Sequence, residues 1–384
     1  MTWPIGYIIT VVIVGWCTFF AVVAPRRPNL LAKMSWFFGM VVNELPFLAI
    51  LFLLAATALA AAEGDLASPA GRITGAVALL VIVGLVVAAW RGVLSDRAVR
   101  AALERHWGPQ WRQQVHAPLR RHRPWLRIIL LPFVRSRADV ERISNISYGD
   151  AGRQNLLDVY RRRDAPQNAP VLIYFHGGGF TSGKKSREAR PLLTWLAHRG
   201  WVCISANYRL RPEASFPDHQ IDGKKVIAWV REHGATYGAD LSRLFVAGSS
   251  AGANIAGVCA FTPNDPMFQP GFESVDTTVT GAVLLYGYYG HYFGAPPAQT
   301  SPLQPQGYLR TGAPPVFIAH GTSDGWGTVE GARDFAARLE EAGGTVVYAE
   351  LPGGQHSFDV FHSARFEAVV DGVDAFTARV LADR

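Results

Sequence analysis

A serine between two glycines is the residue whose surroundings most clearly suggest chemistry. Ser250 lies in the pattern Gly-x-Ser-x-Gly, between Gly248 and Gly252, with an apolar run at residues 244–247 before it and small, helix-compatible residues after it. A strand, a tight turn and a helix in this order form a nucleophile elbow, which lifts the serine hydroxyl clear of the sheet. The glycines leave room where a β-carbon would clash. We therefore expect Ser250 to act as a nucleophile.

A serine hydroxyl needs a base to take its proton and an acid to orient that base. Asp324 follows the apolar run 316–320, and His356 follows the run 345–351. Open α/β sheets build their sites beyond the carboxyl ends of the strands, and the chain order in hydrolases of this architecture is Ser, acid, His. We assign Asp324 as the acid and His356 as the base. The rival candidates by position are Asp265, Asp276, His320 and Asp359.

Three consecutive glycines follow the apolar run 171–175. The order along the chain is His176, Gly177, Gly178, Gly179 and Phe180. Glycines at the end of a strand let backbone N–H groups point at a ligand. Acyl transfer needs such donors where negative charge develops on the carbonyl oxygen, and each is worth about 3 kcal/mol of barrier. The expected oxyanion hole comprises Gly177, Gly178, Gly179 and Ala251, with Gly177 shaping the turn and His176 orienting the loop.

Together with Asn-Tyr-Arg-Leu-Arg-Pro-Glu at residues 207–213, these motifs resemble the hormone-sensitive-lipase-like branch of the α/β-hydrolase esterases. The resemblance extends over residues 145–384. It implies hydrolysis of carboxylic esters through a covalent acyl-serine, with no metal and no cofactor. Two positions depart from the pattern: Asn207 stands where the branch usually has Asp, and Gly325-Trp326 follow the acid where it often has Pro-Leu.

Short apolar runs alternate with helical patterns from residue 144 onward. Strands are expected at 155–160, 171–175, 202–206, 244–247, 282–286, 316–320 and 345–351, and helices at 187–198, 220–233, 251–260, 328–342 and 364–381. Near-continuous apolar strands with helices between them indicate a mostly parallel sheet covered on both faces. The predicted fold class of residues 144–384 is therefore α/β, an α/β-hydrolase fold. The segment 287–315, rich in Gly, Pro and Tyr, is expected to form loops near the pocket.

Apolar runs at residues 5–24, 36–62 and 73–90 predict three transmembrane helices in residues 1–92. No Lys or Arg precedes the first run, which favours an anchor over a cleaved signal peptide. Glu44 and Pro46 interrupt the second run, so Glu44 either faces another helix or marks a span that starts near Pro46. This N-terminal region resembles that of membrane-bound esterases of actinobacteria.

Positive charge is concentrated after the third run. Between Arg91 and Arg137 there are eleven Arg against Asp96 and Glu104. Without a nucleic-acid motif, this charge suits anionic lipid better than nucleic acid. Residues 93–143 are interpreted as a basic amphipathic linker, on the membrane or over the site as a cap. Because the loop after the first run is also basic, the positive-inside rule predicts an outside N-terminus and a cytoplasmic catalytic domain.

These patterns predict a membrane-anchored serine carboxylesterase whose partners are a small-molecule or lipid ester and the membrane. A lipase or lipid deacylase with the same mechanism, and a non-catalytic binding module on this fold, are the alternatives. A transport element has only Glu44 as support within the spans. The three cysteines, Cys17, Cys203 and Cys259, have no metal-ligand or disulfide spacing. Removal of residues 1–90 is expected to release a soluble or peripherally bound hydrolase, and oligomeric state is not indicated.

Overall fold

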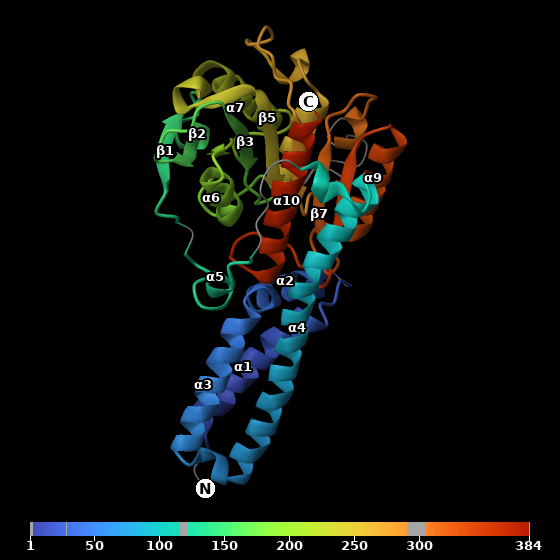
Figure 1. The fold of residues 1–384 in the computed structure, drawn as a ribbon. Coiled ribbons are helices and arrows are strands. Elements are labelled where there is room, and N and C mark those ends of the chain that lie inside the picture. The colour runs from blue at the N-terminus through green and yellow to red at the C-terminus, as the bar shows by residue number, and fades with distance from the viewer. Residues whose placement is uncertain (1–2, 28, 116–121, 135, 290–304, 384) are drawn as a thin grey trace.

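The protein consists of a helical stem and an α/β body (Figure 1). The computed structural model describes residues 3–383 except 28, 116–121, 135 and 290–304. The amino-terminal helices form the stem, and the chain then enters the body, where the carboxyl terminus lies at the far end from the stem. Half of the segment expected to form loops near the pocket, residues 290–304, lies outside the described residues.

The body is built on an eight-stranded sheet of order β1-β2-β4-β3-β5-β6-β7-β8. Its strands are β1 (Val140–Ser147), β2 (Leu156–Arg162), β3 (Ala169–Phe175), β4 (Val202–Ala206), β5 (Ala239–Ser249), β6 (Gly281–Leu285), β7 (Val316–Gly321) and β8 (Val346–Leu351). The pairs β1–β2 and β2–β4 are antiparallel, and all other pairs are parallel. This confirms the predicted mostly parallel α/β sheet.

Helices cover both faces of this sheet. The helices of the body are α6 (Arg190–His198), α7 (Asp218–His233), α8 (Ala251–Phe261), α9 (Val329–Glu341) and α10 (Ala364–Ala382). On one face, α7, α8 and α9 pack against strand residues such as Val171 and Ile173. On the other, α6 and α10 pack against Leu172 and Tyr174. Alternate side chains of one strand thus enter two separate cores.

The edge strand β1 is the one strand of the sheet that the sequence did not predict. Its burial alternates along much of its length, and it carries polar residues such as Glu141, Arg142 and Asn145. A half-exposed polar strand at an edge lacks the continuous apolar run by which the buried strands were recognised.

The stem contains α1 (Ile5–Val22), α2 (Asn29–Glu44), α3 (Pro46–Ala62) and the first part of α4 (Pro69–Trp107). The interruption expected within residues 36–62 is a bend of 82° between α2 and α3, and the second of the two helices starts at Pro46, one of the two interpretations given for it. Pro46 is the first residue of α3; proline suits this position but cannot continue a preceding helix. Among the described residues, α1 and α4 are long and apolar enough to cross a membrane, and the bent pair is a third candidate.

Helix α4 joins the stem to the body without interruption. Its 39 residues correspond to about 58 Å of helix, and they pass through position 92, where we expected the membrane region to end. Val99, Ala102 and Leu103 near its end belong to the core between the sheet and α10. Residues 93–107 are therefore a structural part of the body. In the rest of the expected linker, a short helix, α5 (Trp125–Ile129), precedes β1.

Candidate active site

Ser250 occupies a sharp turn between β5 and α8. Its backbone has φ 54° and ψ −116°, a conformation that a residue with a β-carbon adopts only when its surroundings enforce it. The neighbouring glycines show what enforces it. A β-carbon on Gly248 would overlap the carbonyl group of Gly252, and one on Gly252 would overlap the carbonyl oxygen of Phe175. The turn is therefore compressed between its own helix and β3, as a nucleophile elbow requires.

Hydrogen bonds join the three side chains that the sequence singled out. His356 Nε2 lies 2.9 Å from Ser250 Oγ, and His356 Nδ1 lies 2.8 Å from Asp324 Oδ2. Asp324 follows β7 and His356 follows β8, so both loops emerge at the carboxyl edge of the sheet. This geometry permits proton transfer from the serine to the imidazole while the carboxylate fixes the ring tautomer.

Backbone groups hold the Asp324 carboxylate in place. Its Oδ1 accepts hydrogen bonds from the N–H groups of Trp326 (2.8 Å) and Gly327 (3.0 Å). Burial alone would raise the pKa of this carboxyl, but the charge and hydrogen bond of His356 outweigh burial and lower the pKa. The acid is thus held ionised and oriented toward the imidazole.

The rival acids and base have other partners. His320 Nε2 lies 2.7 Å from the carbonyl oxygen of Gly327 and is farther, at 3.5 Å, from Asp324. Asp276 pairs with Arg231 at 3.1 Å. Asp265 accepts the N–H of Met267, and Asp359 contacts Ser249 rather than Ser250. None of the four replaces the assigned residues.

The glycine loop after β3 presents amides beside Ser250. The Gly177 N–H donates to Glu188 Oε2 at 2.5 Å, so this amide is engaged within the loop, which fits the expected role of Gly177 in shaping the turn rather than in contacting the oxyanion. Gly178 and Gly179 have φ of 127° and 61°, which favour glycine. No other described residue accepts a hydrogen bond from either amide. Ala251 begins α8, so its N–H has no partner within the helix.

His176 supports this loop, as expected. Its ring stacks on Tyr208 with the centroids 4.4 Å apart, and the Tyr208 hydroxyl donates to the His176 carbonyl oxygen at 2.8 Å. Burial lowers the pKa of His176. Asn207, at the position that departs from the family pattern, accepts the Lys185 N–H at 2.7 Å. Asn207 and Tyr208 of the Asn-Tyr-Arg motif thus brace the loops around the site.

A buried acid cluster beneath the elbow was not recognised from the sequence. Asp359 accepts hydrogen bonds from the hydroxyls of Ser249 (2.6 Å), Tyr174 (3.1 Å) and Tyr286. Burial and the nearby charge of Glu188 raise the pKa of Asp359 to about 7. The one signal in the sequence was the position of Asp359 three residues after His356, which made it a rival candidate for the acid. Its contact with Ser249 depends on tertiary structure and could not be predicted.

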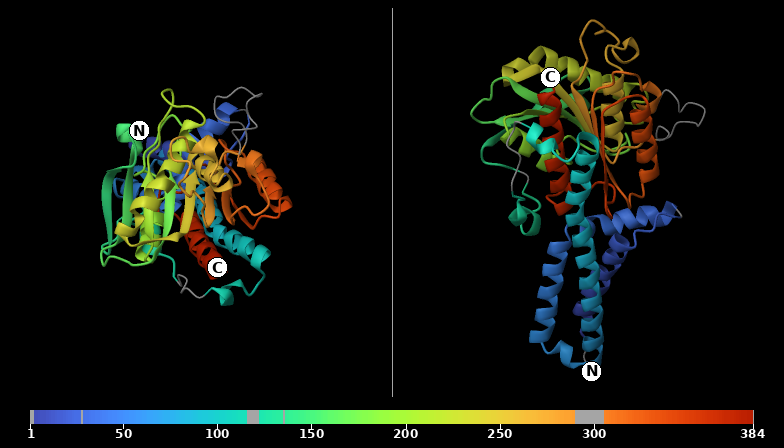
Figure 2. Two further views of the ribbon diagram at one scale, coloured as in Figure 1. Left: turned by 90° about the horizontal axis from the view of Figure 1, so that it is seen from above. Right: turned by 45° about the vertical axis from the view of Figure 1, so that its right-hand side comes forward.

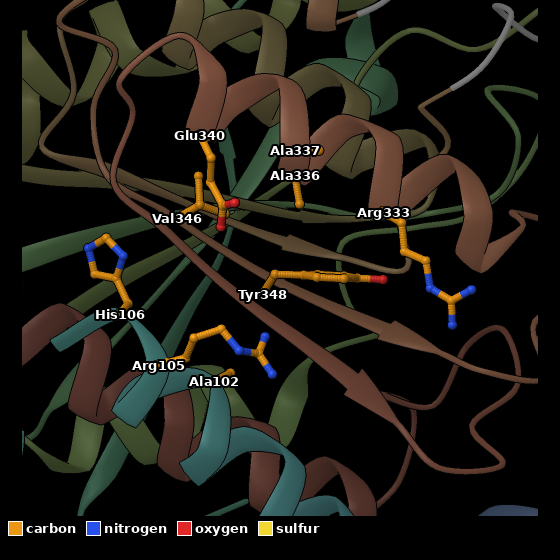
Figure 3. Close-up of a pocket in the computed structure, with 9 residues that line it drawn as sticks. All are labelled: Ala102, Arg105, His106, Arg333, Ala336, Ala337, Glu340, Val346 and Tyr348. Carbon is orange, nitrogen blue, oxygen red and sulfur yellow. The ribbon is translucent and has the colours of Figure 1, made fainter. Parts of the chain in front are cut away.

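A pocket of about 290 Å³ lies apart from these residues, between α4 and the α9–β8 unit (Figure 3). Arg105 and His106 line it from α4, and Arg333 and Glu340 line it from α9. Arg333 is already paired with Glu350, and none of Ser250, Asp324 and His356 lines the pocket. Within the described part of the chain, no group of three or more His, Cys, Asp or Glu could hold a metal ion.

The proteins that this chain resembles in sequence and in structure include a carboxylic ester hydrolase and esterases. Residues 157–289 match the family model BD-FAE. The chain is 34% identical to the probable carboxylic ester hydrolase LipM of Mycobacterium tuberculosis, over 98% of this chain and 94% of LipM. It is 37% identical to the esterase LipQ of the same organism, over 75% of each chain. Among solved structures, the butyrate-bound esterase Est2 of Thermogutta terrifontis superimposes with a TM-score of 0.55 at 25% identity, over 62% of this chain and 93% of that one.

Proposed function

Since this chain belongs to the hormone-sensitive-lipase-like α/β-hydrolase esterases and is a carboxylic ester hydrolase, we propose that it works through an acyl-serine intermediate on Ser250. The observation that carries the proposal is the unbroken chain of hydrogen bonds from Asp324 through His356 to Ser250. A non-catalytic binding module has no need of such a chain, which argues against that alternative.

In the proposed acylation step, Ser250 Oγ bonds to the ester carbonyl carbon and its proton passes to His356 Nε2. The negative charge that develops on the carbonyl oxygen is stabilised by the N–H groups of Gly178, Gly179 and Ala251. Collapse of this intermediate breaks the bond to the alcohol oxygen, which takes the proton back from the imidazolium. Asp324 orients the imidazole and stabilises its positive charge without taking a proton itself.

Deacylation repeats these steps with water as the nucleophile. His356 takes a proton from the water, and the hydroxide oxygen bonds to the acyl carbon. The same amides stabilise the second oxyanion. When the bond to Ser250 breaks, the serine oxygen regains its proton from His356 and the carboxylic acid leaves. Every proton moves between groups already joined in the hydrogen-bonded chain or supplied by the substrate and water.

We place this enzyme in a membrane, with α1, α4 and the bent pair α2–α3 as its anchor and the body in the cytoplasm. Support comes from the apolar composition of these helices and from the basic residues Arg26, Arg27 and Lys33 that follow α1. Arg26 contacts Glu330 and Lys33 lies over the Trp326 ring, so this basic segment is next to the body. A lipase or lipid deacylase of the same mechanism is the second candidate, favoured by the direct contact between the His356 loop and α2.

The test is an ester panel of increasing acyl length, assayed with the full-length protein in detergent beside Ser250→Ala. Wild type should hydrolyse part of the panel, and the variant should lose at least 10³-fold in kcat because the nucleophile is absent. The chain-length preference distinguishes a carboxylesterase for short esters from a lipase. Undiminished turnover by Ser250→Ala would refute the acyl-serine mechanism.

A further inference from the structure

Helix α2 lies at the end of the stem that meets the body, across the carboxyl edge of the sheet where the active site is built (Figures 1 and 2). Its contacts reach the catalytic base directly. The Trp36 indole N–H donates to the backbone carbonyl oxygen of His356 at 3.1 Å. A residue of the amino-terminal region thus holds the backbone of the residue assigned as the general base.

Three further hydrogen bonds fix the same loop. Gln355, next to the base, donates through Nε2 to the Phe20 carbonyl oxygen at 3.0 Å and to Ser35 Oγ at 3.2 Å. Asn43 donates through Nδ2 to the Gly353 carbonyl oxygen at 2.9 Å. The loop from β8 is therefore held at Gly353, Gln355 and His356 by α1 and α2.

The loop that carries the acid rests on the same helix. The ring of Trp326 meets the ring of Trp36 edge-on, with centroids 5.6 Å apart. A β-carbon on Gly325 would lie 3.0 Å from Ala32, which is closer than packed carbon atoms normally approach. This packing explains the departure from the family pattern at Gly325-Trp326. The absence of a side chain at Gly325 allows α2 to approach, and the Trp326 ring packs against Trp36 of that helix.

A buried ion pair fixes the end of α2. Arg365, at the start of α10, pairs with Glu44, and neither side chain is exposed. Ser363 Oγ donates to Glu44 Oε2 at 2.7 Å, and Arg365 also donates to the Pro352 carbonyl oxygen at 3.2 Å. A buried ion pair contributes little net stability but penalises any arrangement in which either charge is left alone. It therefore specifies where α2 ends relative to the His356 loop.

We propose that α2 is a positioning element of the active site, with Trp36 holding the base, Trp36 and Ala32 supporting the acid loop, and Glu44 fixing the register of the helix. This inference rests on the proposed function. Its physical basis is that proton transfer and nucleophilic attack require atoms placed to within a fraction of an ångström, and a displacement of about 1 Å can cost about 100-fold in rate. The membrane region is then part of the catalytic machinery as well as its anchor.

Trp36→Phe in the full-length protein is the principal test, because it keeps an aromatic ring next to Trp326 and removes the indole donor together with the five-membered ring that carries it. Phe37→Leu is the matched control, on the same helix and with 71% of Phe37 exposed. Active sites are counted by fluorophosphonate titration, so that kcat refers to folded enzyme. Trp36→Phe should lower kcat about 2- to 10-fold, the range for one lost hydrogen bond, with KM within twofold. Phe37→Leu should match wild type in both.

Glu44→Gln provides a second measurement, since it keeps the shape of the side chain and removes its charge. It should lower kcat per titrated site as well as the thermal midpoint. If α2 had a purely structural role, Trp36→Phe and Glu44→Gln would lower the thermal midpoint but leave kcat per titrated site at the wild-type value. This result would overturn the inference. If wild type itself lacked Ser250-dependent hydrolysis, the proposed function would fail instead, so the two failures are distinguishable.

Discussion

Asp324 and Asp359 are two carboxyl groups buried near the same serine, and their surroundings give them opposite properties. Asp324 faces an imidazole and two backbone donors, so its pKa falls despite burial. Asp359 is buried among hydroxyls and near a second carboxylate, Glu188, so its pKa rises to about 7. Chain order favoured the first as the acid. The sequence could not separate the two by environment, because the hydroxyls around Asp359 come from Ser249, Tyr174 and Tyr286, far away in the chain.

Asp359→Asn should change how stability depends on pH. The folded protein holds a proton on Asp359 that the unfolded chain, with an ordinary pKa of 3.8, releases. Its contribution to stability is therefore fully present below about pH 4 and is lost as pH rises through about 7. Asparagine does not titrate. The thermal midpoint of the variant should lie further below wild type at pH 5 than at pH 8.

Asp276→Asn is the matched control for this comparison. Burial of Asp276 is outweighed by hydrogen bonds from Thr278 and the charge of Arg231, which lower its pKa. It is ionised in both states from pH 5 to 8, so its effect should be constant over that range. If Asp359→Asn lowered the thermal midpoint equally at the two pH values, or more at pH 8 than at pH 5, this result would contradict the assignment of a buried, protonated Asp359.

At the scale of elements, the sequence predicted best the buried strands and the turn whose conformation depends on a local motif. The runs at 171–175 and 316–320 became β3 and β7 because uninterrupted apolar residues suit a strand covered on both faces. The Gly-x-Ser-x-Gly motif became an elbow because its glycines permit close backbone contacts. The continuation of α4 past residue 92 was not predicted. Its apolar residues there pack against α10, and the many charged residues beside them were interpreted as a linker.

Gly252→Ala should damage the elbow, because the added β-carbon would overlap the Phe175 carbonyl oxygen in the neighbouring strand. Neither backbone segment can move without shifting Ser250 or β3. We expect a loss of about 1–3 kcal/mol in stability together with loss of most ester hydrolysis. Thermal unfolding and kcat per titrated site are the measurements.

Gly331→Ala, in the first turn of α9, is the corresponding control. The nearest atom to its new β-carbon is 3.8 Å away, an ordinary contact, and alanine is the better helix former. This variant should be as active and as stable as wild type or slightly more stable. Equal behaviour of the two alanine variants would show that the elbow is not compressed in the way described.

At the scale of the whole molecule, stem and body are joined more closely than the sequence suggested. Apolar length and charge indicated spans, but contacts between α2 and loops more than 280 residues later leave no local pattern. Glu44 was seen as an interruption of a span, and its partner Arg365 could not be identified without the fold. Removal of residues 1–90 is still expected to release a soluble or peripherally bound hydrolase, but one that lacks the contacts of α2 with the loops of the body.

A chain lacking residues 1–90 should be a poor enzyme. It would lose Trp36, Asn43 and Glu44, and with them the hydrogen bonds to the His356 loop and the partner of Arg365. We expect kcat per titrated site to fall on the order of 10- to 100-fold relative to the full chain in the same detergent, with a lower thermal midpoint. A truncated protein with the full rate would mean that the stem serves as an anchor alone.

The central claim is that Ser250 is the nucleophile, activated by His356 and Asp324. The most direct measurement is labelling of the full-length protein with a fluorophosphonate, followed by digestion and mass mapping of the modified peptide. The account predicts one adduct, on Ser250, whose formation slows on the order of 10³-fold or more when His356 is replaced by Ala. An adduct on another serine, or labelling of Ser250 at an unchanged rate without His356, would contradict it.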